Sequence, residues 1–342
     1  MSSAEAVADP PSNEHVSLEG RLFRNSPLGV LGTSAVIFVI AAGGFLLIST
    51  VVGYPLLTKA GVVLDHAVPG LVGPLLLATA LGMNRYADMK QRAEVGAFAQ
   101  ILSTRSPAIE ALLAPPSSEH RALASLIGAA AGVVVASVSM PQIVLRAYPA
   151  VYGWQFALIT VLCTLFMRGA VQTSRTWRNL HYIIEHALRI DLLHADKLSV
   201  IGRQTARQAL VWFTTAAVVC LYFVGGDRGL TTIPILVLCT GLGLWIFLRP
   251  MAGVHRRVQA AKTAELERVR DEIARAGRDE ATDPQAAARL PGLIAYEARI
   301  HAVPEWPFDQ STLIRVATYV LIPAVPWFGE AIVSEMLQRL AH

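Results

Sequence analysis

Long apolar runs separated by charged segments set the pattern of the chain. Six stretches of 19 residues or more contain no Asp, Glu, Lys or Arg, and they cover residues 25–58, 66–84, 122–145, 147–167, 208–226 and 229–248. Because a bilayer core of about 30 Å needs roughly 20 residues of helix, each run is long enough to cross a membrane. A seventh run, 310–329, reaches this length once Arg315 is allowed as a residue that extends toward the headgroups.

This pattern predicts an all-α fold, a polytopic bundle of about seven transmembrane helices with helical cytoplasmic extensions. Composition agrees, because 54% of the residues are hydrophobic and 16% are charged, against about 25% charged in soluble domains. Disordered, collagen-like and disulfide-stapled classes are excluded. We expect four regions: a flexible cytoplasmic arm over 1–24, a six-helix membrane region over 25–248 with helical cytoplasmic loops at 85–121 and 168–207, a cytoplasmic helical and hinge segment over 249–309, and a polar, proline-containing membrane helix over 310–342.

The basic residues predict the orientation. When the connections between the runs are assigned alternately to two sides, 24 Lys and Arg fall on the side of the N-terminus and four on the other, with Arg315 inside the last run. Basic residues collect on the cytoplasmic side of membranes. We therefore expect a cytoplasmic N-terminus and an outer C-terminus, and the 25 arginines against four lysines favour a bacterial inner membrane. The net charge of +4 then follows from topology and predicts no nucleic-acid partner.

The cytoplasmic segments have helical spacing. Residues 175–208 extend the fourth helix, and residues 251–277 form a charged helix with a thin apolar seam. Residues 279–288 suggest a polar hinge, after which Pro291 starts an amphipathic helix that packs on other helices or lies at the headgroups. Trp177, Trp212, Trp245 and Trp306 fall near the inner ends of the runs, where amphipathic rings prefer to lie.

Two apolar runs carry small or helix-breaking residues. The second contains Pro69, Gly70, Gly73 and Pro74, which predict a kink or a partly unwound helix, either as a simple bend or as the lining of a cavity. The third carries a stripe of small residues at steps of four: Ala124, Gly128, Gly132 and Ala136. Such a stripe predicts close contact with another helix, from the same chain or from a neighbouring one.

The last helix is the most polar of the seven. Its candidate pore or pathway residues are Arg315, Thr318, Tyr319, Pro323, Pro326, Glu330, Ser334 and Glu335. Ionisable groups at membrane depth are candidates for function, although Arg315 and Glu330, about 22 Å apart along a helix, could equally anchor its two ends.

The sequence gives little support for an enzyme or a metal-binding protein. The chain contains no HExxH, GxSxG, P-loop or dinucleotide motif, and we expect neither a cofactor nor a metal. His181 and His186 are five residues apart, so they do not share a helix face. The three cysteines lie in apolar runs without CxxC spacing, which predicts free thiols.

These features favour a homo-oligomeric cation channel whose last helix lines the pore, with Glu330 and Glu335 near its outer mouth. In topology alone the arrangement resembles insect chemoreceptor channels. The alternatives are a membrane-anchored sensor or assembly scaffold that binds a cytoplasmic protein through its inner helices, and a small-molecule transporter, which the lack of carboxylates in the first six runs disfavours. The expected partners are the lipid bilayer and further copies of the chain.

Overall fold

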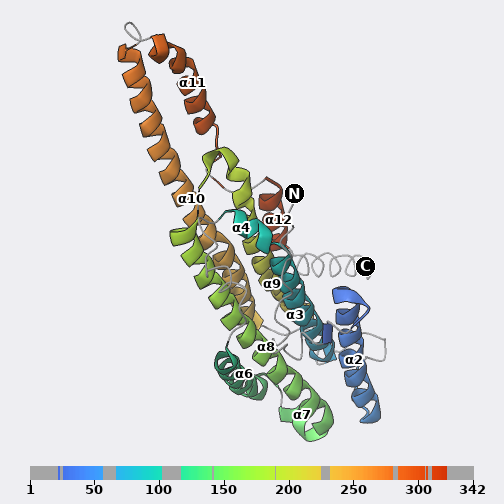
Figure 1. Cartoon of the computed structure of the whole chain (residues 1–342). Coiled ribbons are helices and arrows are strands. Elements are labelled where there is room, and N and C mark those ends of the chain that lie inside the picture. The colour runs from blue at the N-terminus through green and yellow to red at the C-terminus, as the bar shows by residue number, and fades with distance from the viewer. Residues whose placement is uncertain are drawn as a thin grey trace, which may run out of the picture.

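The computed structural model describes residues 22–23, 26–56, 67–101, 117–140, 142–188, 190–224, 232–279, 284–304, 306 and 310–321. The elements of these residues are all helices, which confirms the all-α prediction (Figure 1). In chain order they are α2 (Gly29–Val51), α3 (Val68–Ala93), α4 (Val95–Gln100), α6 (Ser118–Ser139), α7 (Gln142–Ala147), α8 (Pro149–Tyr182), the π-helix η2 (Ile183–Ala187), the 3-10 helix η3 (Leu192–Leu198), α9 (Ser199–Val224), α10 (Thr232–Asp279), α11 (Pro284–His301) and α12 (Gln310–Leu321).

Four helical segments of the described chain are long and apolar enough to cross a membrane. They are Gly29–Val51, Ser118–Ser139, Pro149–His186 and Ile233–Arg278. Their surfaces carry large apolar side chains that point away from the protein, such as Leu31 on α2, Leu126 on α6 and Val237 on α10, which are 87%, 69% and 65% exposed. An apolar exterior of this extent suits contact with lipid tails rather than water.

Sequential long helices of the bundle run antiparallel. Phe45 of α2 lies against Gly70 of α3, and Ser34 of α2 lies against Gly82, so the residue numbers rise in opposite directions. The same holds for α9 and α10, where Phe213 lies against Gly243 and the earlier residue Ile201 shares a buried cluster with the later residue Val254. In these two pairs each helix therefore reverses the direction of the helix before it.

The stripe of small residues on α6 packs against α8. All four residues, Ala124, Gly128, Gly132 and Ala136, are buried. A Cβ atom placed on Gly132 would lie 2.6 Å from the Cα atom of Thr160, and one on Gly128 would lie 2.7 Å from the Cα atom of Thr164. The two backbones approach so closely that no side chain fits between them, and the contact is made within one chain.

The largest buried cluster lies at one end of the bundle. It joins α4, α8, η2, α9, α10 and α12 through side chains that include Phe98, Ile183, Ile201, Met251 and Val316. The predicted extension of the fourth helix is present, since α8 and η2 together continue to Ala187. The segment from Ser199 onward belongs instead to α9.

Three predicted boundaries were wrong. The third run does not stay helical to Leu145, because Met140, which precedes a proline, is extended (φ −93°, ψ 129°), and α7 follows as a separate helix. The sixth run and the charged helix after it form one helix, α10, that includes Pro250. The next helix begins at Pro284 instead of Pro291, because proline suits a first helical turn and three alanines follow closely.

The second helix is continuous. Residues from Val68 to Ala93 form α3, so Pro69, Gly70, Gly73 and Pro74 do not unwind it as one alternative expected. Pro69 lies in the first turn, where a missing N–H breaks no intrahelical bond, and Pro74 lies inside the helix. Gly70 leaves room for the ring of Phe45, since a methyl group there would overlap it.

The second half of α10 and all of α11 form a helical hairpin that projects from the bundle (Figure 1). We call residues 252–301 the arm. Val258, Val269 and Ile300 are buried, with at most 1% exposed. Lys262 Nζ on α10 donates to the carbonyl oxygens of His301 and Val303 at the end of α11, both at 3.0 Å. A cation bound to the last carbonyls of a helix stabilises its negative end, so Lys262 fixes α11 against α10.

Candidate functional site

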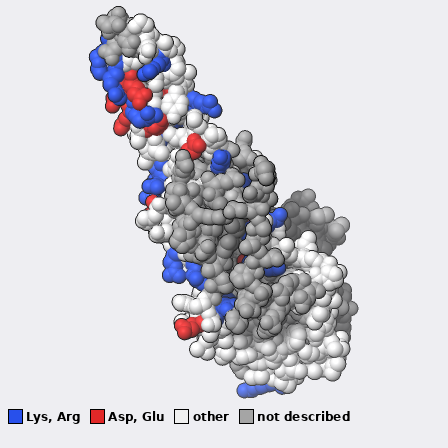
Figure 2. Space-filling model, viewed as in Figure 1, with Lys and Arg blue, Asp and Glu red and all other residues white. Residues whose placement is uncertain are grey.

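Charged side chains concentrate on the arm and at the end of the bundle next to it. Arg92 ends α3, Arg175 and Arg178 lie late in α8, and Arg203 and Arg207 lie early in α9, which places all of them at this end of the antiparallel bundle. Figure 2 shows Lys and Arg along the arm and the adjoining part of the bundle, whereas the far end shows few charges in that view. We call this the basic end of the bundle.

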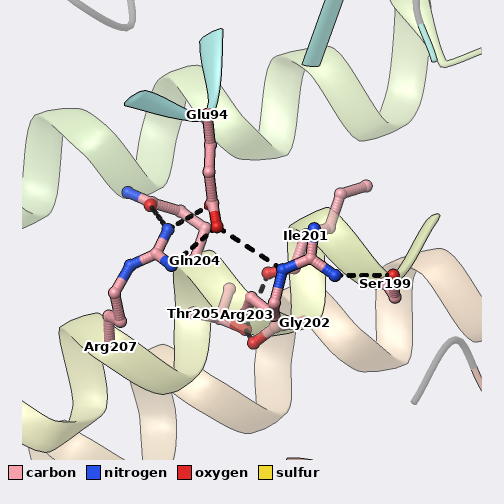
Figure 3. A network of polar contacts seen from close by, with 8 residues as sticks. All are labelled: Glu94, Ser199, Ile201, Gly202, Arg203, Gln204, Thr205 and Arg207. Atoms are coloured by element: carbon pink, nitrogen blue, oxygen red, sulfur yellow. Dashed lines mark hydrogen bonds and ion pairs between the residues drawn. The ribbon is translucent and has the colours of Figure 1, made fainter. Parts of the chain in front are cut away.

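A charge network at the basic end joins the turn between α3 and α4 to the first turns of α9 (Figure 3). Glu94 occupies the turn, as the C-cap of α3 and the N-cap of α4. Arg207 Nη1 donates to Glu94 Oε1 at 2.9 Å, and Arg207 Nη2 donates to Glu94 Oε2. This two-pronged pairing of a guanidinium with a carboxylate is the strongest ion-pair geometry available to side chains.

Neighbouring residues of α9 complete the network. Arg203 Nε donates to Glu94 Oε1 at 3.4 Å, and Arg203 Nη1 donates to Ser199 Oγ at 2.9 Å. Arg207 Nη2 also donates to Gln204 Oε1 at 2.8 Å. The amide nitrogen of Gln204 and the Nε atom of Arg207 have no hydrogen-bond partner among the described residues. Two guanidiniums against one carboxylate leave the network with one net positive charge.

The network is largely shielded from solvent. The side chain of Arg207 is 13% exposed and that of Glu94 is 20% exposed, while Gln204 is 1% exposed. Burial alone would raise the pKa of Glu94, but the hydrogen bonds and charges of Arg207 and Arg203 outweigh it, so the pKa of Glu94 lies below its usual range. The carboxylate is therefore charged at neutral pH and holds the α3–α4 turn against α9.

Acidification should release this turn. Because the pKa of Glu94 is lower in the folded state than its unfolded value of about 4.3, its stabilising effect is complete above that pH and is lost as the pH falls through the folded-state pKa. We expect the amides of α4 to lose protection in hydrogen exchange below about pH 4. Glu94→Gln should show no such acid-dependent step. A Glu94→Gln variant whose α4 loses protection on acidification in the same way as the wild type would contradict this assignment.

The polar last helix is described only at its start. On α12, Val316 is buried in the basic-end cluster, and Tyr319 packs against the same cluster. Thr318 is exposed, and its hydroxyl donates to the carbonyl oxygen of Ile314 at 2.9 Å. The side chain of Arg315 and the whole of Pro323, Pro326, Glu330, Ser334 and Glu335 lie outside the described residues. The pore candidates therefore stay a prediction.

The side chains of His181 and His186 contact different partners. His181 Nε2 lies 3.2 Å from Glu185 Oε1, whereas the ring of His186 stacks on Tyr182 with centroids 4.8 Å apart. Among the described residues, no group of three His, Cys, Asp or Glu side chains is placed to hold a metal ion.

Sequence reasoning missed the network around Glu94. Ser199, Arg203 and Arg207 recur at steps of four, so one helix face carries all three, and this spacing was the available signal. Glu94 offers no comparable signal, because 109 and 113 residues separate it from its two arginine partners.

Comparison with known proteins adds no relative: no family model, no curated protein and no solved structure matches the chain.

Proposed function

We propose that the protein is a membrane-anchored sensor or assembly scaffold that binds a cytoplasmic protein through the arm. One observation carries this proposal: α10 is a single helix of 48 residues that begins in an apolar run and ends at the tip of the arm. At 1.5 Å per residue it is about 72 Å long, more than twice the thickness of a bilayer core. The anchor and the arm therefore share one backbone element.

The contacts inside the arm support a stable projecting surface. Arg270 Nε donates to Glu297 Oε1 at 2.8 Å, and the hydroxyl of Tyr296 donates to Glu265 Oε1 at 2.9 Å, so α10 and α11 are joined at several levels. Ile294 lies on α11 and is 52% exposed. A large apolar side chain exposed among charges is a suitable centre for a protein contact.

The proposal includes the seven-span topology in a bacterial inner membrane, with the basic end inside the cell. Antiparallel helices and the gathering of arginines at one end support it, since basic residues collect on the cytoplasmic side. The N-terminus would then be cytoplasmic and the C-terminus outside.

A cysteine at position 294 tests both the orientation of the chain and the binding of a protein by the arm. In a variant without the three native cysteines, Ile294→Cys should react with a membrane-impermeant maleimide only after the cells are permeabilised, and a photo-cross-linker attached there should capture one protein of defined mass. Val134→Cys on α6 is the matched control, because Val134 is 62% exposed on an apolar face and should contact lipid only.

Lys262→Ala should reduce the capture at position 294 severalfold, because it removes the two bonds that fix α11. Labelling of position 294 in intact cells would contradict the proposed orientation. An unchanged amount of captured protein in the Lys262→Ala variant would contradict the role of the arm.

The second candidate is a homo-oligomeric cation channel lined by the last helix. The observation in its favour is the place of α12, which packs on α9 at the basic end and keeps Ile314, Thr318 and Leu321 exposed. A helix at the edge of the bundle can meet its counterpart in another subunit.

Charge removal at the expected outer mouth tests the channel. In reconstituted bilayers, Glu330→Gln with Glu335→Gln should shift the reversal potential toward lower cation selectivity, because acidic rings attract cations. Glu272→Gln, which removes a carboxylate of the arm that pairs with Arg268, is the control and should change nothing. Purified protein that carries no current under voltage, tension or added ligands would exclude this candidate.

A further inference from the structure

An arginine at the basic end is held between two tryptophan rings. Arg249 follows directly after the apolar run 229–248 on α10. Its guanidinium carbon lies 4.6 Å from the ring centroid of Trp245, one turn earlier on α10, and 4.9 Å from that of Trp177 on α8. Trp177 also stacks on His181, with centroids 5.4 Å apart and planes 7° apart. We call Trp177, Trp245 and Arg249 the arginine clamp.

No anionic partner of the clamp's guanidinium is found among the described residues. Within the described part of the chain, Arg249 takes part in no hydrogen bond and no ion pair, and its contacts are the two cation–π contacts. Glu185 of η2, the acidic residue nearest to Trp177 in the sequence, contacts His181 instead. A cation–π contact attracts the positive charge but uses none of the five N–H donors of the guanidinium. The clamp therefore orients a cation whose donors remain available.

The surroundings of the clamp are positive and accessible. Arg178, the residue after Trp177 in α8, is exposed. Arg249 is exposed, and Trp245 is 52% exposed. A ligand that reaches the clamp from outside would meet the exposed guanidinium of Arg249 beside the indole ring of Trp245.

The position along α10 identifies the class of ligand. Tryptophan side chains prefer the headgroup level of a bilayer, and Arg249 lies at the point where the apolar run meets the charged arm. Phosphodiester groups are the anions present at that level, and the planar fork of a guanidinium matches two phosphate oxygens. A headgroup with a net negative charge suits a site without a nearby carboxylate better than a zwitterionic one.

We propose that the arginine clamp binds the phosphate of an anionic phospholipid at the basic end of the bundle. The proposal rests on the membrane placement of α10 and is independent of the function of the arm.

Fluorescence quenching by brominated lipids tests the clamp in the full-length protein. Purified protein in nanodiscs of phosphatidylcholine is given increasing fractions of phosphatidylglycerol or phosphatidylcholine with brominated chains. We expect phosphatidylglycerol to quench at the lower fraction, and Trp245→Phe to remove most of that difference. Arg249→Gln should weaken the apparent affinity for phosphatidylglycerol roughly tenfold, the effect of losing about one charge-assisted hydrogen bond.

Two further variants separate recognition from charge and folding. Arg249→Lys keeps the cation and its contact with the rings but loses the planar fork of the guanidinium. Its affinity for phosphatidylglycerol should therefore fall between those of the wild type and Arg249→Gln. Arg256→Gln removes an exposed arginine two turns further along α10 and should leave the affinity unchanged. An equal loss in Arg249→Gln and Arg256→Gln would overturn the clamp in favour of general charge attraction.

The controls distinguish the source of the phosphate and the placement of the helix. Inorganic phosphate at millimolar concentration should not relieve the quenching, and relief would assign the clamp to free phosphate instead of lipid. Equal quenching by both lipids would overturn the clamp alone. Absence of quenching by either lipid would overturn the membrane placement of α10 together with the clamp.

Discussion

Gly132→Ala is expected to be among the most damaging single-methyl changes in the described part of the bundle. The added Cβ atom would lie 2.6 Å from the Cα atom of Thr160, 3.2 Å from its carbonyl oxygen and 3.1 Å from the Cβ atom of Cys163. Because the first two atoms belong to the backbone of α8, no change of rotamer relieves the overlap, and the two helices must separate. Overpacking of a close contact costs about 1–3 kcal/mol, and we expect the upper part of that range or more.

Gly153→Ala provides the matched control. Gly153 also lies in an apolar segment of α8 that is long enough to cross a membrane, but a Cβ atom there meets nothing within 4 Å. Alanine should be neutral or stabilise the helix by up to about 1 kcal/mol, because glycine costs conformational entropy in a helix. Unfolding of both variants by a denaturing detergent, followed by circular dichroism, compares them directly. If Gly132→Ala unfolds at the same detergent fraction as Gly153→Ala, the close contact of α6 and α8 is wrong.

Breaking the Glu94–Arg207 pair is expected to cost nearly as much. Glu94→Gln leaves the guanidinium of Arg207, only 13% exposed, opposite a neutral amide. Removing one partner of a buried pair costs about 3–5 kcal/mol when burial is complete, and we expect about 2–3 kcal/mol here because part of the network reaches solvent. Arg207→Gln should cost a similar amount, because it leaves the carboxylate without its main donor.

The double variant shows whether the two residues act on each other. Glu94→Gln with Arg207→Gln should cost less than the sum of the single changes by at least about 1 kcal/mol, because no unpaired charge then remains. The control is the pair Arg268–Glu272 on the arm, whose side chains are 55% and 36% exposed. The corresponding single change, Glu272→Gln, should cost at most about 1 kcal/mol, as exposed pairs do. Additive effects at Glu94 and Arg207 would show that the network does not join the two helices.

The features that the sequence predicted well are those with local periodicity. Apolar runs long enough for a bilayer became helices, and small residues at steps of four in α6 became a close contact with α8. Both follow from the geometry of one helix, which a sequence carries without knowledge of its neighbours.

The features that it predicted poorly depend on the neighbours. The sequence divided this region into an apolar run to residue 248 and a separate charged helix from residue 251, but both belong to α10, which includes Pro250. Phe247, Met251 and Val254 around this proline are buried in the basic-end cluster. Burial of three large side chains offsets the roughly 3 kcal/mol that an internal proline costs. Nothing in the sequence indicated that Trp212 would be buried, yet it is 5% exposed and packs edge-on against Phe166 of α8, with centroids 5.1 Å apart.

The length of α10 has a geometric consequence for the arm. A helix adapts to a thinner or thicker bilayer by changing its tilt. The 31 residues from Arg249 to Asp279 extend about 46 Å beyond the end of the apolar run, so a change of 10° in tilt would carry the tip sideways by about 8 Å if the helix moves as one rod. A small adjustment to membrane thickness would thus become a displacement of the tip larger than the pitch of one helical turn, about 5.4 Å.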